Sequence, residues 1–315
     1  MTTAIETRAL TKCYGNATAV QDVTLVIPHG ELFGLFGANG AGKTTLIRML
    51  TTLLAPTRGE AYVNSFDVVK HADAVRASVG MVFSNENSFY GRLSGRENLK
   101  FFAALQNVPR QNVRVRVDEL LRMFTLDRHA DAMFQTYSTG MRQKMNVARA
   151  LLHDPPILFL DEPTKGMDVQ TADAVRVLLK QEIVARQGKT VFLTTHDLYE
   201  MEHLCDRIGV IAHGEMRVFG RPREVLNQAR RKPLYQIELA QPLAEVTKLL
   251  ERVNGIRELR AEGARVEFEA DTEIFSEKEL WDVIYAAGGQ IRKFGPADQG
   301  LRALLRDAAD DEQLV

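Results

Sequence analysis

The chain has 315 residues, a length that favours about two domains over one. Hydrophobic residues make up 45% and charged residues 26%, which is typical of a folded globular protein and excludes a disordered chain. The 40 Lys and Arg residues balance 41 Asp and Glu residues, so the net charge of −1 excludes a broad basic surface for nucleic acid or anionic lipid.

The two cysteines, Cys13 and Cys205, lie far apart and form no CxxC pair, which predicts reduced packing residues rather than a zinc or redox site. The first residues lack the basic and apolar segments of a signal peptide, and no run approaches 18 consecutive apolar residues. We therefore expect a cytoplasmic protein without direct membrane insertion, which reaches a membrane only through a protein partner.

Short strands and turns are predicted for residues 5–36, where apolar and polar residues alternate and Pro28 and Gly30 interrupt the pattern. A glycine-rich loop follows at residues 37–44. Apolar residues then recur at helical spacing over residues 46–53, and Pro56 with Gly59 ends that element. The order is strand, loop and helix.

The middle of the chain is predicted to be helical over residues 94–152, where apolar residues recur every three or four positions. Continuous apolar runs at residues 157–160, 191–194 and 208–211 are typical of buried strands, and a helical pattern covers residues 169–185. Together these elements predict an α/β protein with a helical insertion.

A different pattern begins after residue 229. Strands are predicted at residues 235–239, 257–259, 266–268 and 291–294, and helices at residues 246–253 and 277–287. This order of strand, helix, strand, strand, helix, strand suits a small α+β domain of the ferredoxin-like kind. We predict a first domain at residues 1–229, with a helical subdomain at about 94–152, and a second domain at residues 230–315.

The glycine-rich loop matches GxxxxGK[ST] and lies between a predicted strand and a predicted helix, as this motif requires. Glycines let backbone N–H groups surround a phosphate, and the start of the following helix adds partial positive charge. Lys43 would neutralise the outer phosphates, and Thr44 would supply a hydroxyl to Mg²⁺. A glycine-rich turn that precedes a lysine by chance is the alternative. The residues predicted to bind nucleotide here are Gly37, Ala38, Asn39, Gly40, Ala41, Gly42, Lys43, Thr44 and Thr45.

Two carboxylates follow the buried run at residues 157–160, at the strand end where ligands bind to parallel sheets. Asp161 is predicted to hold Mg²⁺, directly or through water. Glu162 would face the γ-phosphate and polarise the attacking water as a general base. A hydrophobic strand that ends in Asp-Glu is common on its own, and it is the phosphate loop that favours the functional interpretation.

The order of these motifs over residues 4–225 resembles the nucleotide-binding domain of ATP-binding cassette (ABC) proteins, a P-loop NTPase fold with an antiparallel β subdomain and a helical subdomain. The resemblance implies further roles. Tyr14 stands where the family stacks an aromatic ring on adenine, and Ser138 and Gly140 stand in the family signature that contacts the ATP of another subunit. Asp168 would cross the dimer interface, and His196 would sense the γ-phosphate beside the catalytic Glu162 and Lys43.

Several residues depart from the family pattern. The family usually has Gln near position 84, and here Ser84, Asn85 or Asn87 is left to supply an oxygen; Ser84 would need a water to reach Mg²⁺. Lys165 stands where a Ser is common. The signature YSTGM resembles the branch that exports drugs, lipids or polysaccharides.

The resemblance implies an ATPase that binds ATP and Mg²⁺, forms a homodimer and drives separate transmembrane permease subunits from the inner face of the cell membrane. Residues 83–96, with Phe89 and Tyr90, are the expected contact for the permease, although this aromatic pair suits local packing equally well. The rival hypothesis is a non-transport ABC ATPase, either a regulator or a nucleic-acid-associated factor. The absence of a second cassette or a long basic insertion disfavours the latter.

Overall fold

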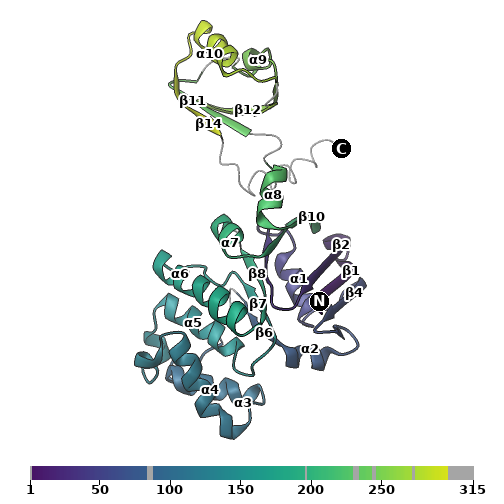
Figure 1. The fold of residues 1–315 in the computed structure, drawn as a ribbon, viewed down its shortest axis with the longest axis vertical. Coiled ribbons are helices and arrows are strands. Elements are labelled where there is room, and N and C mark those ends of the chain that lie inside the picture. The colour runs from purple at the N-terminus through teal and green to yellow at the C-terminus, as the bar shows by residue number, and fades with distance from the viewer. Residues whose placement is uncertain are drawn as a thin grey trace. The chain divides into compact units, whose positions relative to one another are not determined.

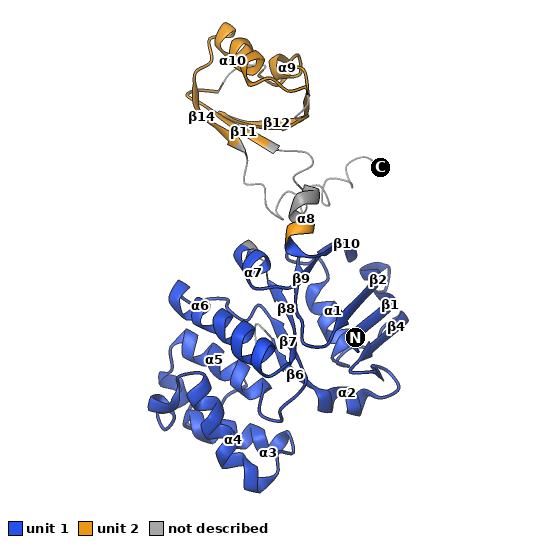
Figure 2. Ribbon diagram, in the orientation of Figure 1, with its two compact units in different colours: residues 1–222 blue, residues 223–315 orange. Residues whose placement is uncertain are grey.

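The computed structural model describes residues 2–83, 88–195, 197–229, 234–242, 246–271 and 274–296. Its contacts divide the chain into two units, residues 1–222 and residues 223–315 (Figure 2). Ser84 and His196, both predicted site residues, lie outside the described residues. Cys13 and Cys205 are free thiols, as predicted, and Cys205 is buried.

The first unit contains two sheets, and the antiparallel one lies at its side (Figure 1). An antiparallel sheet has the order β2-β1-β4-β5, and a second sheet has the order β10-β9-β3-β8-β7-β6. In the second sheet β9, β3, β8, β7 and β6 are parallel and β10 is antiparallel to β9. The strands are β1 (Thr3–Tyr14), β2 (Ala17–Pro28), β3 (Leu32–Phe36), β4 (Arg58–Val63), β5 (Phe66–Asp67), β6 (Val79–Val82), β7 (Ile157–Asp161), β8 (Thr190–Thr195), β9 (Arg207–Ala212) and β10 (Glu215–Gly220).

The strands of the parallel sheet are buried on both faces, which explains their continuous apolar sequences. Every residue of β3, β7 and β8 is buried. Strand β2 instead alternates between buried and exposed positions, because only one face of its sheet is covered. One apolar core joins the two sheets and α1, with Ile5, Phe33 and Leu46 among its members.

Helices pack around these sheets and fill the stretch between β6 and β7. Helix α3 begins after a capping box, in which the Ser94 hydroxyl accepts from the Glu97 N–H and the Glu97 carboxylate accepts from the Ser94 N–H. The α/β fold with a helical insertion is confirmed. The helices are α1 (Lys43–Leu50), α2 (Ala72–Ser78), α3 (Gly95–Leu105), α4 (Arg110–Met123), α5 (Thr139–Ala150), α6 (Val169–Val177), its continuation as the π-helix η3 (Leu178–Arg186), and α7 (Leu198–His203).

The second unit is a small α+β structure, as predicted from the sequence. Its sheet is antiparallel, with the order β12-β13-β11-β14, so its first and third strands lie at the centre. A separate apolar core that includes Ile237, Phe268 and Leu280 packs the helices on this sheet. The elements are α8 (Pro222–Ala229), β11 (Leu234–Leu239), α9 (Val246–Leu250), β12 (Ile256–Glu262), β13 (Arg265–Ala270), α10 (Glu277–Ala286) and β14 (Ile291–Pro296).

Candidate functional site

The glycine-rich loop connects the end of β3 to the start of α1, and two of its glycines are required by close contacts. A Cβ at Gly37 would lie 2.5 Å from the carbonyl oxygen of Ile211. A Cβ at Gly42 would lie 2.5 Å from the carbonyl oxygen of Ala19, and Gly42 has a φ of 106° as the N-cap of α1. The loop therefore curls tightly against β2 and β9 and ends at the start of α1, and the N-terminus of a helix favours an anion.

Lys43 is buried, and its ammonium closes the loop. Its Nζ donates to the carbonyl oxygens of Gly37 at 2.7 Å and Ala38 at 2.9 Å. Burial lowers the pKa of Lys43, while the nearby carboxylates of Glu162 and Asp161 oppose that shift. A positive charge is thus fixed beside the loop, where an anionic ligand would meet it.

Asp161 ends β7 with its carboxylate held on both oxygens. The Thr44 hydroxyl donates to Oδ2 at 3.2 Å, and the Thr194 hydroxyl at the end of β8 donates to Oδ1 at 2.5 Å. Asp161 and Thr194 are both buried. Three elements thus meet at one carboxylate, which orients it toward the phosphate loop.

Glu162 follows directly in an unusual backbone conformation. Its φ is 52°, in the left-handed region that is uncommon for residues other than glycine. Its N–H donates to the carbonyl oxygen of Thr194 at 3.0 Å and also lies 3.3 Å from the Thr194 hydroxyl. Its carboxylate forms an ion pair with Lys165, with 2.5 Å between Oε2 and Nζ. Strain of this kind clusters at functional sites, where the surrounding structure enforces it.

These residues surround a cavity of about 220 Å³. The predicted site residues that line it are Asn39, Gly40, Gly42, Lys43, Thr44, Thr45, Asp161 and Glu162. Ala19 and Lys165 line it as well, and neither is among the site residues predicted from the sequence. The sequence does contain one indication of a role for Lys165, because a basic residue stands where a Ser is common in the related family.

Three other predicted residues that the structure describes, Ser138, Gly140 and Asp168, do not line this cavity. Ser138 is the N-cap of α5 and accepts from the Met141 N–H at 3.2 Å, while Gly140 lies in the first turn of that helix. Asp168 is the N-cap of α6, where its hydrogen bond with Thr171 lowers the pKa of its exposed carboxyl. In this single chain Ser138 and Asp168 each cap a helix.

Tyr14 also lies outside the cavity. Its side chain is 51% exposed, and the Lys12 ammonium lies 5.4 Å from the centre of its ring. One face of an exposed aromatic ring is a suitable stacking surface for a base.

A polar network ties the loop after β7 to α6 and α7. The Thr164 hydroxyl donates to Glu200 Oε1 at 2.5 Å, and Arg176 Nε donates to the same oxygen at 3.0 Å. Arg176 also pairs with Asp197 and Asp173, each at 2.8 Å. Glu200 is 1% exposed, so these contacts compensate a desolvated carboxylate.

Similar proteins identify the architecture. A family model described as ABC transporter matches residues 20–165. The ABC transporter ATP-binding protein NatA of Bacillus subtilis (strain 168) is 36% identical over 70% of this chain and 88% of its own length. The chain belongs to the ATP-binding subunits of ABC transporters. It therefore binds and hydrolyses ATP, and its fold class is that of an ABC ATPase.

Other ABC proteins extend the match. The daunorubicin/doxorubicin resistance ATP-binding protein DrrA of Streptomyces peucetius is 38% identical over 81% of this chain and 77% of its own length. The solved structure of cbiO1 from Clostridium perfringens, part of the ABC transporter complex cbiONQ, has a TM-score of 0.67 at 27% identity, covering 72% of this chain and 92% of that one.

The ABC cassette MJ0796, solved as a dimer in a post-hydrolysis state bound to ADP and Pi, has a TM-score of 0.62 at 29% identity, covering 69% of this chain and 98% of that one. Across the ranges that the structure describes, no helix is both long and apolar enough to cross a membrane.

Proposed function

We propose that this ABC subunit hydrolyses ATP to drive export through a separate membrane-embedded permease. The observation that carries the proposal is the convergence of Lys43, Thr44, Asp161 and Glu162 on one cavity at the ends of β3 and β7. The export direction is supported by the resistance function in the name of its relative DrrA. A separate permease is consistent with cbiO1 being part of a larger transporter complex.

In this proposal the chain's own residues divide the work of hydrolysis. Lys43 and the loop N–H groups bind the outer phosphates, and Tyr14 stacks on adenine. Glu162 accepts a proton from the attacking water, because its carboxylate faces the same cavity as Lys43. The network around Glu200 supports the loop that follows Glu162.

The donor set also fits Mg²⁺. Within the described residues, His, Cys, Asp and Glu form no group of three that could hold a metal alone. Mg²⁺ commonly takes one or two protein oxygens and completes its shell with phosphate and water, which suits Thr44 and Asp161. When bound there, the ion would neutralise phosphate charge.

Two copies of the chain are proposed to meet head to tail. Ser138, Gly140 and Asp168 do not line the phosphate cavity of their own chain, so a second chain is needed to bring them to ATP. The Ser138 hydroxyl already accepts from the Met141 N–H, and a hydroxyl that accepts can still donate its own hydrogen. The dimeric form of the related cassette supports this arrangement. His196 is proposed to act beside Glu162.

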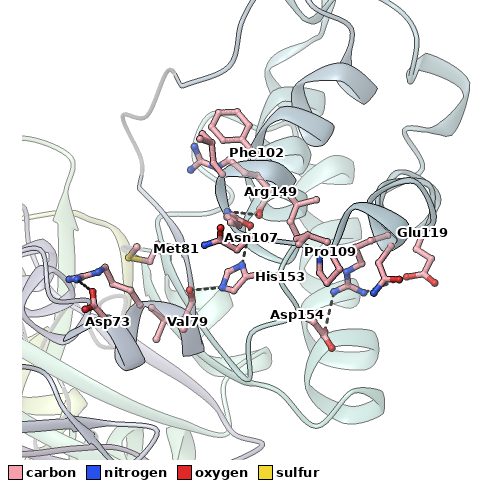
Figure 3. Close-up of a pocket in the computed structure, with 18 of the residues that line it drawn as sticks. Asp73, Val79, Met81, Phe102, Asn107, Pro109, Glu119, Arg149, His153 and Asp154 are labelled. Atoms are coloured by element: carbon pink, nitrogen blue, oxygen red, sulfur yellow. Dashed lines mark hydrogen bonds and ion pairs between the residues drawn. The ribbon is translucent and has the colours of Figure 1, made fainter. Parts of the chain in front are cut away.

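A cavity lined in part by α3 is the proposed contact for a cytoplasmic helix of the permease. Its volume is about 1220 Å³, and Leu105 is among its lining residues. The apolar side chains of Met81 and Phe102 line it as well (Figure 3). Its polar wall includes His153, whose ring contacts the Gln106 side chain at 3.0 Å and the Val79 carbonyl oxygen at 3.1 Å.

Part of the permease contact predicted from the sequence is packed inward. Phe89 stacks on Phe134 with ring centroids 4.6 Å apart and also contacts Phe102. Tyr90 is 51% exposed and remains the candidate for direct contact. This contact would hold the protein on the inner face of the cell membrane.

The domain boundaries predicted from the sequence stay a proposal, and the contacts divide the chain slightly earlier, between residues 222 and 223. Residues 1–229 would form the nucleotide-binding domain, with helices of about 94–152 as its subdomain. Residues 230–315 would form a ferredoxin-like domain, an assignment supported by a sheet whose first and third strands are central.

A charge-neutral substitution of the base tests the proposal. Glu162→Gln should retain ATP binding, lose most turnover and form a stable dimer when ATP and Mg²⁺ are added, as measured by light scattering after size exclusion. The control is Glu31→Gln, which removes a different ion pair, that with Arg207 at 2.7 Å, and should neither stop turnover nor trap a dimer. A Glu162→Gln variant that hydrolyses ATP normally and stays monomeric would refute the assignment.

A further inference from the structure

Lys165 forms an asymmetric ion pair with the proposed catalytic base. Its Nζ lies 2.5 Å from Glu162 Oε2, and the Lys165 N–H donates to the Glu162 carbonyl oxygen at 3.2 Å, which closes the turn between them. The Glu162 side chain is only 8% exposed, whereas the Lys165 side chain is 53% exposed. The carboxylate is therefore fixed and desolvated, while the ammonium is on a flexible stem that reaches it from solvent.

Lys165 lines two cavities at once. One is the phosphate cavity, which it shares with Lys43 and Glu162, and the other is a neighbouring cavity of about 560 Å³ that Glu162, Thr164 and Arg176 also line. The ammonium thus stands at the boundary of the space that a phosphate would fill. Lys43 lines this space from the start of α1, and Lys165 lines it from the turn beside the base.

A phosphate that enters this cavity meets an ammonium that is already paired with a carboxylate. Phosphate oxygens carry more charge than one carboxylate and accept hydrogen bonds strongly, so the two anions compete for Lys165. As long as the ammonium stays on Oε2, that oxygen is occupied and the carboxylate is a weaker acceptor for a proton from water.

We propose that Lys165 is a positioning residue that exchanges the Glu162 carboxylate for the terminal phosphate when ATP binds, and so releases the base only when its substrate is present. The inference rests on the proposed role of Glu162 as the base. It gives the cation at position 165 a function in nucleotide selection, because ADP lacks the phosphate that would draw the ammonium away.

An ordinary ion pair between neighbours in a turn is the competing explanation. Exposed pairs of this kind contribute little, and the loss of one should not depend on which nucleotide is bound. The chain contains a matched example, Lys70 with Asp67, which has the same spacing, a lysine side chain that is 72% exposed, a carboxylate that is 13% exposed and a distance of 3.3 Å. Lys70 does not line the phosphate cavity.

The test measures ATP and ADP affinity by calorimetry in the presence of Mg²⁺, in a Glu162→Gln background that stops turnover. Adding Lys165→Met should weaken ATP binding by about tenfold or more, because one charged hydrogen bond to phosphate is lost, and should change ADP binding by less than about twofold. Lys165→Arg should restore ATP affinity, and Lys70→Met should leave both affinities unchanged. Equal weakening of ATP and ADP by Lys165→Met would overturn the exchange.

The same substitution in the chain that retains Glu162 separates exchange from simple phosphate binding. There the ammonium must leave a carboxylate before it reaches the phosphate, so Lys165→Met should cost less ATP affinity than in the Glu162→Gln background, by about threefold or more. An equal cost in both backgrounds would overturn the exchange. Normal hydrolysis by Glu162→Gln alone would instead overturn the proposed base, a result that the nucleotide affinities do not duplicate.

Discussion

The hydroxyl of Thr194 is expected to support both the stability of the first unit and its use of Mg²⁺. It donates at 2.5 Å to Asp161 Oδ1, and both residues are buried. Thr194→Val keeps the shape of the side chain but leaves one oxygen of a buried carboxylate without that donor, a loss of about 1.5–3 kcal/mol. For a unit of this size, about 2 kcal/mol corresponds to a Tm lowered by about 4–8 °C.

The matched control is Thr190→Val, an identical substitution on the same strand. The Thr190 hydroxyl is also buried, but it accepts from the backbone N–H of Gly30 at 3.0 Å, a neutral hydrogen bond whose loss costs about 1 kcal/mol. Thermal melting followed by circular dichroism should therefore separate the two variants. In addition, only Thr194→Val should raise the Mg²⁺ concentration for half-maximal ATPase activity, by about tenfold, because it alone frees the carboxylate to rotate. Equal melting shifts and an unchanged Mg²⁺ requirement in both variants would refute this reasoning.

Three other substitutions probe separate parts of the first unit. Gly37→Ala places a Cβ 2.5 Å from the carbonyl oxygen of Ile211 and should cost about 1–3 kcal/mol of stability and weaken ATP binding. Gly91→Ala, whose added Cβ would lie 3.5 Å from Gln135 Cβ, should do neither, and equal effects of the two variants on melting and ATP titration would contradict the close contact. Leu105→Asp, at a side chain 62% exposed in the large cavity, should abolish copurification with the permease but leave the ATPase rate of the isolated subunit unchanged, and retained copurification would exclude this surface. Burial lowers the pKa of His153, so the unfolded chain takes up this proton at a higher pH than the folded chain. The contribution of His153 to stability should therefore be complete above its ordinary pKa of about 6.5. As the pH drops below that value, the free energy of unfolding should decrease by at most about 1.4 kcal/mol per pH unit. His153→Gln should flatten the dependence of Tm on pH, and an unchanged slope would mean that other groups cause it.

The parts of the fold predicted from the sequence are those with strong local signals. The phosphate loop was predictable because only glycines fit against Ile211 and Ala19, and buried strands such as β7 were predictable because both of their faces are covered. Short elements were missed. Helix α2 has seven residues and β5 has two, too few for a periodic pattern to emerge.

Contacts between distant segments were beyond the sequence analysis. Thr194 was assigned to a strand, but its hydrogen bond to Asp161 depends on the pairing of β7 with β8, which periodicity does not specify. Lys165 was noted only as a departure from the family, because its position beside Glu162 follows from a turn and a positive φ that residue types do not reveal. The roles of Tyr14, Ser138 and Asp168 stay predictions, since they require ligand or a second chain.

The buried carboxylate of Glu200 links the loop after β7 to the helices α6 and α7. Thr164 from the loop after β7 and Arg176 from α6 both hold an oxygen that belongs to α7, the helix after β8. Displacing either Thr164 or Arg176 would therefore break a hydrogen bond to a buried carboxylate. A displacement of the loop beside the proposed base would therefore be transmitted to α6 and α7, which gives that loop a direct mechanical route to the neighbouring helices.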